Sequence, residues 1–248
     1  MSTLTAVVLT YNEEKHLPDC LISLAWAPEV LVFDSFSTDH TLEIARAAGA
    51  RVEQRRFDNY AEQRNAALAA ISTEWVLFVD ADERATPELA QAAQAVLNEP
   101  QAGWWIPRHN YIFGKLTQYA GWYPDYQLRL LRRAQARYDS GHPVHEIVKL
   151  EGAAGYLSPP LIHLNYETVA EFIAKQKYYA RYDAQGLAAA GVRVKTRHFL
   201  LQPLRHFYWR WIQLAGWRGG WHTLRLSLFM SYFELEKYRI LANVNHQC

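Results

Sequence analysis

Cysteine and long apolar runs are scarce in this sequence. Its 248 residues include two cysteines, Cys20 and Cys248, which lie far apart and show no metal-binding spacing. A disulfide framework is therefore excluded, and the low cysteine content fits a reducing compartment such as the cytoplasm. The sequence has no uncharged apolar run of about eighteen residues, the length that a membrane-spanning helix needs. The first apolar stretch, residues 4–9, is too short for a secretory signal and follows no basic residue, so we expect no signal peptide.

What the sequence does contain indicates a folded protein with two different parts. Half of the residues are hydrophobic and 14% are aromatic, which supplies a packed core and argues against disorder. The formal net charge of +1 conceals an asymmetry. Residues 175–239 carry twelve Lys or Arg against three acidic residues, a net charge of +9, so the rest of the chain is acidic. An acidic first part and a basic, aromatic tail suggest separate roles.

Apolar runs and helical patterns alternate over the first hundred residues. Continuous apolar runs are typical of strands covered on both faces. Such strands joined by crossover helices predict an α/β fold with a doubly wound, mostly parallel sheet and helices on both faces. The expected strands are residues 6–9, 30–33, 51–54 and 75–79, and the helices cover 16–26, the segment after Asp39, 59–70 and the segment after Thr86.

After Pro100 the pattern changes to a mixed, loop-rich region and then to helix. Glycine and proline interrupt three further expected strands, at residues 104–113, 127–131 and 144–150. Helical patterns return from Glu167, in three segments separated near Gly191 and residues 216–220. We therefore expect one domain over residues 1–165 and a helical extension over residues 166–248.

Polar side chains gather where the expected parallel strands end, the edge at which such sheets bind ligands. Residues 10–13, Asp34 and the turn Asp80-Ala-Asp82 all lie at these ends. Two carboxylates on one tight turn suit Mg²⁺ or Mn²⁺ that is also held by substrate phosphates, although acidic turns are often simply solvated. Asp34 is placed to accept a hydrogen bond from a base N–H.

Four motifs occur in a fixed order: Thr10-Tyr-Asn-Glu-Glu, Asp34-Ser-Phe-Ser-Thr-Asp, Gln63-Arg-Asn-Ala-Ala and Asp80-Ala-Asp-Glu. Together they resemble the family 2 glycosyltransferases, which have the GT-A fold and invert the anomeric configuration. Within that family, residues 123–133 and 142–146 resemble lipopolysaccharide inner-core glucosyltransferases and their relatives. The resemblance implies transfer of a hexose such as glucose from a UDP-sugar to a hydroxyl of a glycolipid or a core-like saccharide.

The resemblance also assigns roles to single residues, and those at the nucleotide come first. The loop that begins at Thr10, together with Tyr11, Glu13 and Asp34, would hold the nucleoside. Arg64 would lie near the diphosphate or the donor sugar.

A second group of residues would hold the metal ion. Asp80 would face the ribose and the metal, Asp82 would be the direct ligand of Mg²⁺ or Mn²⁺, and His145 could complete the metal shell. One departure concerns Phe36, which stands where the family often has glycine.

An inverting transfer needs a general base that removes the acceptor's proton on the side opposite the departing diphosphate. The Asp80–Asp82 turn cannot lie on that side. Glu146, which follows a loop with glycine and proline, is the first candidate. Asp125, in an aromatic loop suited to stacking on sugars, is the second.

The tail interleaves arginines with aromatic residues. On helices this pattern gives a cationic side and an apolar side rich in Trp and Phe, as in helices that lie on anionic membranes. We therefore expect a cytoplasmic protein held peripherally on the inner face of the membrane.

The aromatic side chains of the tail could instead pack on the first domain or in a homo-oligomer. The acidic first part disfavours nucleic acid as a partner. The arginines are Arg197, Arg205, Arg210, Arg218 and Arg225, and the aromatics are Phe207, Trp209, Trp211, Trp217 and Trp221.

Three other classes of protein share parts of this pattern. A nucleotidyltransferase would have a glycine-rich, basic loop after the first strand, where this chain has two acidic residues and no glycine. A phosphohydrolase would carry its Asp-x-Asp on the first strand rather than the fourth. An inactive sugar-binding or membrane-scaffolding protein with the same fold is the non-enzyme alternative.

Overall fold

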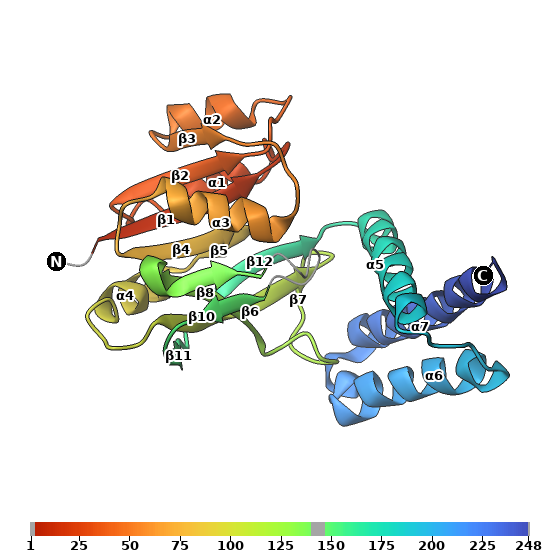
Figure 1. Cartoon of the computed structure of the whole chain (residues 1–248). Coiled ribbons are helices and arrows are strands. Elements are labelled where there is room, and N and C mark those ends of the chain that lie inside the picture. The colour runs from red at the N-terminus through yellow and green to blue at the C-terminus, as the bar shows by residue number, and fades with distance from the viewer. Residues whose placement is uncertain (1–2, 140–146, 248) are drawn as a thin grey trace. The chain divides into compact units, whose positions relative to one another are not determined.

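The computed structural model describes residues 3–139 and 147–247 and shows a mixed α/β protein (Figure 1). Its residue contacts define two compact units. The first consists of residues 1–108 and 125–163, and the second of residues 109–124 and 164–248. The second unit thus combines a segment from the middle of the chain with the C-terminal helices.

Four parallel strands form one half of the sheet of the first unit. In spatial order they are β3 (Arg51–Gln54), β2 (Glu29–Asp34), β1 (Leu4–Thr10) and β4 (Trp75–Asp80). The register places Thr10 opposite Asp34 and Leu9 opposite Asp80, so the polar strand ends meet at one edge. The helices that connect or follow these strands are α1 (Leu17–Ser23), α2 (Thr41–Ala47), α3 (Tyr60–Ala70) and α4 (Pro87–Ala95).

The other half of the sheet is largely antiparallel. β8 (Asp125–Arg132) runs antiparallel to β4, and β6 (Gly103–Ile112) runs antiparallel to β8. Several short strands were not expected from the sequence, because runs of two to six residues give little periodic signal. They are β5 (Glu83–Ala85), β7 (Lys115–Leu116), β9 (Ala136–Tyr138), β11 (Ala154–Tyr156) and β12 (Leu161–Tyr166). β10 (Val148–Leu150) pairs with β9 and falls within the strand expected over residues 144–150.

Helices cover both faces of the sheet, as the sequence predicted. Alternate residues of β1 point to opposite faces. Val8 belongs to a buried cluster with Leu17 of α1 and Leu89 of α4, whereas Val7 belongs to a cluster with Leu68 of α3. Burying each such Val or Leu side chain stabilises the fold by about 1.5–3 kcal/mol.

The second unit contains the three expected C-terminal helices, α5 (Val169–Ala189), α6 (Thr196–Tyr208) and α7 (Gly220–Gln247). A π-helical turn over Trp209–Gln213 and a 3-10 turn over Gly216–Gly219 join α6 to α7. Thr168 and Glu171 form a capping box that starts α5. Phe172 of α5 packs in a small core with Leu226 and Phe233 of α7. Over the part of the chain that the structure describes, no helix combines the length and the apolar character needed to cross a bilayer.

Candidate active site

Hydrogen bonds join the loops that follow β1 and β2. The Asn12 amide donates to the Ser37 hydroxyl at 2.8 Å, and the Thr38 amide donates to the Asn12 side-chain oxygen at 2.8 Å. The Glu13 amide donates to the Thr41 hydroxyl at 2.8 Å. Asn12 has a left-handed backbone with a φ of 57°, which asparagine adopts more readily than most residues. The two loops predicted to hold the nucleoside are therefore fixed to each other.

Asp34 lies fully buried at the carboxyl end of β2. One carboxylate oxygen accepts from the Thr10 hydroxyl at 3.0 Å and from the Ser37 hydroxyl. The other accepts from the Ser37 amide at 2.8 Å and from the Gln54 side chain at 3.0 Å. A carboxylate offers roughly four lone-pair positions, so a base N–H would have to displace one of these donors. Asp34 thus holds the loops in place here, and its contact with a nucleoside stays a prediction.

Two aromatic side chains stand exposed on these loops. Tyr11 is 60% exposed and Phe36 is 49% exposed. Phe36 has a φ of 64°, the left-handed conformation that suits glycine and costs other residues about 1–2 kcal/mol. The geometry explains why glycine is suited to this position. Phe36 keeps that backbone conformation and adds a ring to the surface beside the predicted nucleoside loops.

The same loops carry an exposed ion pair between Glu14 and His40. The His40 amide and imidazole both lie within hydrogen-bond distance of one Glu14 carboxylate oxygen, at 3.1 and 2.8 Å. The bonds from His40 lower the pKa of Glu14, and the bond to Glu14 raises the pKa of His40 above its ordinary value. This pair adds one more tie between the two loops, and it weakens as His40 loses its proton.

Three arginines donate to the carboxylates of Asp80 and Glu83 at the acidic turn after β4. Asp80 accepts from Arg64 at 3.1 Å and from both terminal nitrogens of Arg129, one of them at 3.1 Å. Glu83 is fully buried and accepts from Arg129 at 3.1 Å and from Arg108 at 3.4 Å. Burial alone would raise the pKa of Asp80, but the charges of Arg129 and Arg64 outweigh it and hold that pKa well below its usual value. Asp80 is therefore an ionised carboxylate that arginine side chains already engage.

Arg64 and Arg129 reach this turn from different elements. Arg64 comes from α3, is only 4% exposed, and places its guanidinium 4.9 Å from the ring centre of Phe78 and 5.7 Å from that of Tyr138. The structure thus brings Arg64 to the predicted site. Arg129 was not singled out from the sequence, although a charged residue inside the apolar run of β8 was its visible signal.

β12 brings to Asp82 a histidine that the sequence analysis did not select. β12 runs antiparallel to β5 and places His163 opposite Glu83. The His163 Nε2 atom lies 3.3 Å from an Asp82 carboxylate oxygen, and the two side chains are 7% and 27% exposed. A carboxylate and an imidazole form a donor pair that Mn²⁺ accepts. Within residues 3–139 and 147–247, no three Asp, Glu, His or Cys side chains converge as a metal cluster.

Asp125, the second candidate for the base, is held by neighbouring side chains. Two nitrogens of Arg108 lie 2.8 and 2.7 Å from one oxygen, and Gln127 donates to the other at 2.8 Å. Removing an acceptor's proton would have to compete with the Arg108 pair, so the geometry favours a positioning role for Asp125. Glu146 and His145 lie outside the described residues, and their assigned roles stay predictions.

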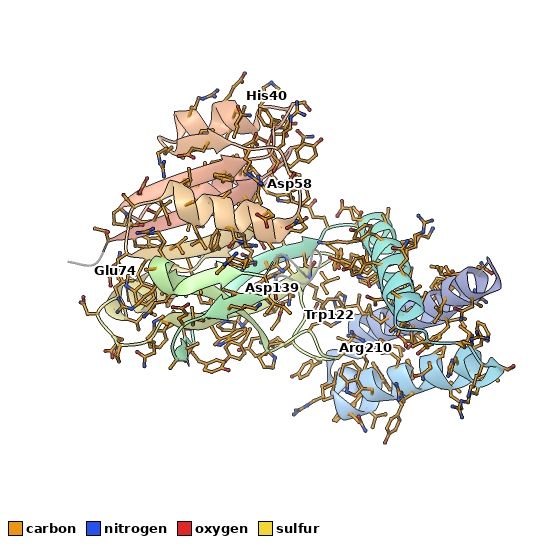
Figure 2. All side chains as sticks on the ribbon, viewed as in Figure 1. His40, Asp58, Glu74, Trp122, Asp139 and Arg210 are labelled. Carbon is orange, nitrogen blue, oxygen red and sulfur yellow. The ribbon has the colours of Figure 1, made fainter. Side chains whose placement is uncertain are left out.

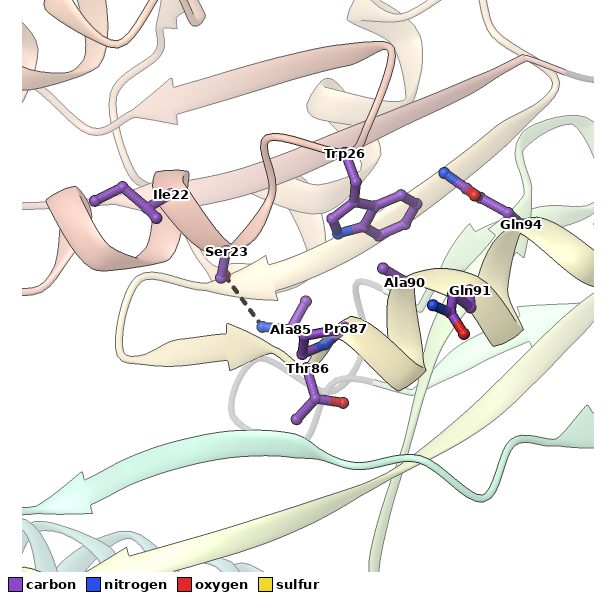
Figure 3. A pocket seen from close by; sticks show the side chains of 9 residues that line it. All are labelled: Ile22, Ser23, Trp26, Ala85, Thr86, Pro87, Ala90, Gln91 and Gln94. Atoms are coloured by element: carbon purple, nitrogen blue, oxygen red, sulfur yellow. Dashed lines mark hydrogen bonds between the residues drawn. The ribbon is translucent and has the colours of Figure 1, made fainter.

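A separate pocket of about 400 Å³ lies between α1 and α4 (Figure 3). Its lining contains no charged side chain, whereas a nucleoside diphosphate requires charged or metal partners. The lining residues are Ile22, Ser23, Trp26, Ala85, Thr86, Pro87, Ala90, Gln91 and Gln94. None of them belongs to the predicted site, so this pocket is not the candidate donor site.

Comparison with known proteins agrees with the geometry. The family described as glycosyl transferase family 2 matches residues 5–148. The lipopolysaccharide core biosynthesis glycosyltransferase LpsC of Rhizobium meliloti is 30% identical over 230 residues, which cover 88% of this chain and 83% of that protein. An uncharacterized glycosyltransferase of Rickettsia prowazekii is 33% identical over 262 aligned residues, covering 98% of this chain and 88% of the relative.

Solved structures share the fold at lower identity. TarS 1–349 of S. aureus has a TM-score of 0.50 and 17% identity, with 99% of this chain and 91% of that chain covered. Glucosyl-3-phosphoglycerate synthase from Mycobacterium tuberculosis in complex with phosphoglyceric acid also has a TM-score of 0.50, with 18% identity and coverages of 78% and 82%. The chain has the GT-A fold of these glycosyltransferases. The chain belongs to glycosyltransferase family 2.

Proposed function

We propose that this protein is a metal-dependent, inverting hexosyltransferase that uses a UDP-sugar as its donor. Its acceptor is a hydroxyl of a glycolipid or of a saccharide like the lipopolysaccharide core. The observation that carries the proposal is the pairing of Asp82 with His163 beside Asp80, at the edge where the parallel strands end. Likeness over most of the chain to a lipopolysaccharide core glycosyltransferase supports the acceptor class.

Asp82 and His163 would hold a divalent metal ion such as Mn²⁺ or Mg²⁺. The donor set fits, because it combines a hard carboxylate oxygen with an imidazole nitrogen at 3.3 Å from each other. The predicted contribution of His145 to the metal shell stays a separate expectation. When bound, the ion supplies positive charge that stabilises the departing diphosphate.

Side chains of the protein orient the substrates and accept the proton. Arg64 and Arg129 fix the Asp80 carboxylate in one orientation, which suits a hydrogen bond to a ribose hydroxyl. Tyr11 offers an exposed ring that can pack on the nucleoside. Asp125 positions Arg108, and Glu146 takes the acceptor's proton.

A panel of UDP-sugars tests this function directly. We expect one UDP-hexose to be hydrolysed slowly without acceptor and transferred when a core-type saccharide is added, with Mn²⁺ or Mg²⁺ required in both cases. The measurement is release of UDP, with EDTA as the control. A protein that binds UDP-sugars but never releases UDP would be the inactive binding protein considered above.

Replacing Glu146 with glutamine tests the base. The substitution keeps the shape and removes the basicity, so kcat should fall by roughly 10²–10⁴-fold while UDP affinity stays nearly unchanged. Asp125→Asn should show a milder loss, expressed mainly in the acceptor KM. If Asp125→Asn is inactive and Glu146→Gln is active, the role passes to Asp125. If both remain active, neither carboxylate is the base.

A further inference from the structure

The helix α6 and the π-helical turn after it present an apolar side to solvent. No residue of α6 is fully buried. The exposed apolar side chains recur at intervals of three or four residues, which places them on one side of the helix. We call this set the α6 face. It consists of Leu200 (67% exposed), Leu201 (59%), Leu204 (65%), Tyr208 (53%), Trp209 (42%) and Ile212 (48%).

Helix α5, which precedes α6 in the chain, shows what an ordinary exposed surface looks like in the same unit. Its exposed positions carry mainly charged or polar side chains, including Glu171, Lys177, Arg181, Asp183 and Gln185. Surface helices normally bury their apolar side and expose the polar one. An apolar side turned to solvent over four turns marks an interaction site rather than a solvated surface.

Positive charges predominate along the chain on either side of the α6 face, and Glu234 of α7, whose charge reaches His206, is paired with Lys237. Residues 184–233 contain seven Lys or Arg and neither Asp nor Glu. Five of these cations are exposed: Arg193, Lys195, Arg197, Arg205 and Arg218. An interfacial helix has this combination of exposed Leu and Trp side chains with arginines and lysines on its flanks.

The other two arginines of the stretch serve packing within the unit. Arg210 donates to the Ala120 carbonyl at 2.7 Å and lies 5.5 Å from the ring centre of Trp122 (Figure 2). Burial lowers the pKa of Arg210 to about 10. Arg225 lies 4.7 Å from the ring centre of Phe113. These contacts lie within the second unit, and they remove Arg210 and Arg225 from the exposed surface.

We propose that the α6 face is a docking surface for an anionic lipid bilayer. The leucines, Tyr208 and Trp209 would enter the boundary between headgroups and acyl chains, while Arg197 and Arg205 contact lipid phosphates. A second copy of the chain is a poorer occupant, because two such faces would bring an excess of cations together, and Glu234 of α7 is already paired with Lys237. The proposal is independent of the donor sugar.

Vesicle sedimentation of the full chain tests the proposal. The protein should bind vesicles of phosphatidylcholine and phosphatidylglycerol, bind phosphatidylcholine alone much more weakly, and bind less as salt rises. Leu201→Gln with Leu204→Gln should weaken binding by about tenfold or more. Arg197→Gln with Arg205→Gln should weaken it by about fivefold per arginine and flatten the salt dependence.

Matched controls change exposed residues elsewhere. Tyr178→Gln on α5 and Ile22→Gln on α1 remove side chains that are 58% and 73% exposed, and Lys177→Gln with Arg181→Gln removes two exposed charges of α5. All of these control variants should bind vesicles as strongly as the parent.

Equal vesicle binding by the leucine variant and the parent would overturn the proposal. The proposal would also be overturned if the parent protein did not bind vesicles but formed a dimer that the leucine variant disrupts. UDP release with a water-soluble acceptor should be unchanged in every variant, which separates this surface from the transferase function.

Discussion

Asp82→Asn should abolish sugar transfer and remove the effect of metal on UDP binding. The reason is that Asp82 supplies the carboxylate of the proposed metal site, and asparagine is a neutral and much poorer ligand. Charge stabilisation by a metal ion contributes several kcal/mol, so transfer should fall by about 10³-fold or more. Calorimetry should show tight UDP binding to the parent only with Mn²⁺, and equally weak binding to the variant with Mn²⁺ or EDTA.

His163→Ala is the companion variant, because the two side chains lie 3.3 Å apart. It should raise the Mn²⁺ concentration at which UDP binding reaches half its maximum, while UDP binding in EDTA stays at the parent's level. His109→Ala changes a histidine of the second unit and serves as the control. If UDP affinity in the parent proves indifferent to metal, the assignment of Asp82 and His163 is wrong.

Arg129→Met should lower the free energy of unfolding by about 3–5 kcal/mol, the usual effect of leaving a buried charge without its partner. Arg129 lies 3.1 Å from the fully buried Glu83 and also pairs with Asp80. Methionine keeps much of the length of the side chain and removes its positive charge. The loss of stability therefore measures the contribution of the ionic contacts more than that of the packing. Urea or thermal unfolding measures the change.

The same substitution at the exposed Arg137 of β9 is the matched control, and it should change stability by less than about 0.5 kcal/mol. Adding Glu83→Gln to Arg129→Met should restore part of the loss, because the buried carboxylate is then neutral. Wild-type stability in the single variant would show that Arg108 alone satisfies Glu83. In that case the ionic contacts of Arg129 would matter less for the stability of the fold than their burial indicates.

Local patterns were sufficient to predict the four parallel strands β1 to β4 and the helices between them. The continuous apolar runs of β1 and β4 predicted parallel strands whose polar ends meet at one edge, and the order of the motifs predicted the family. The three C-terminal helices were also predicted, because the glycines at Gly191 and within residues 216–220 end the periodic helical patterns.

The interactions between distant segments could not be read in this way. His163 meets Asp82 only because β12, eighty residues later, pairs with β5 in a particular register. The contacts of Arg129 and Arg108 with Asp80 and Glu83 depend on β8 pairing with β4 and on β6 pairing with β8. Short strands give weak periodic signals, and pairing partners far apart in sequence leave no local trace.

In the basic tail, too, the sequence determined some properties and the tertiary structure determined others. Composition alone determined that residues 184–233 are cationic and rich in aromatics, because these are properties of the sequence itself. Only the tertiary structure decided that Arg210 donates to the Ala120 carbonyl while Leu201 and Leu204 are exposed to solvent. Which side of a helix is buried depends on the neighbours that the tertiary structure supplies, and a helix with apolar residues on more than one side does not encode that choice locally.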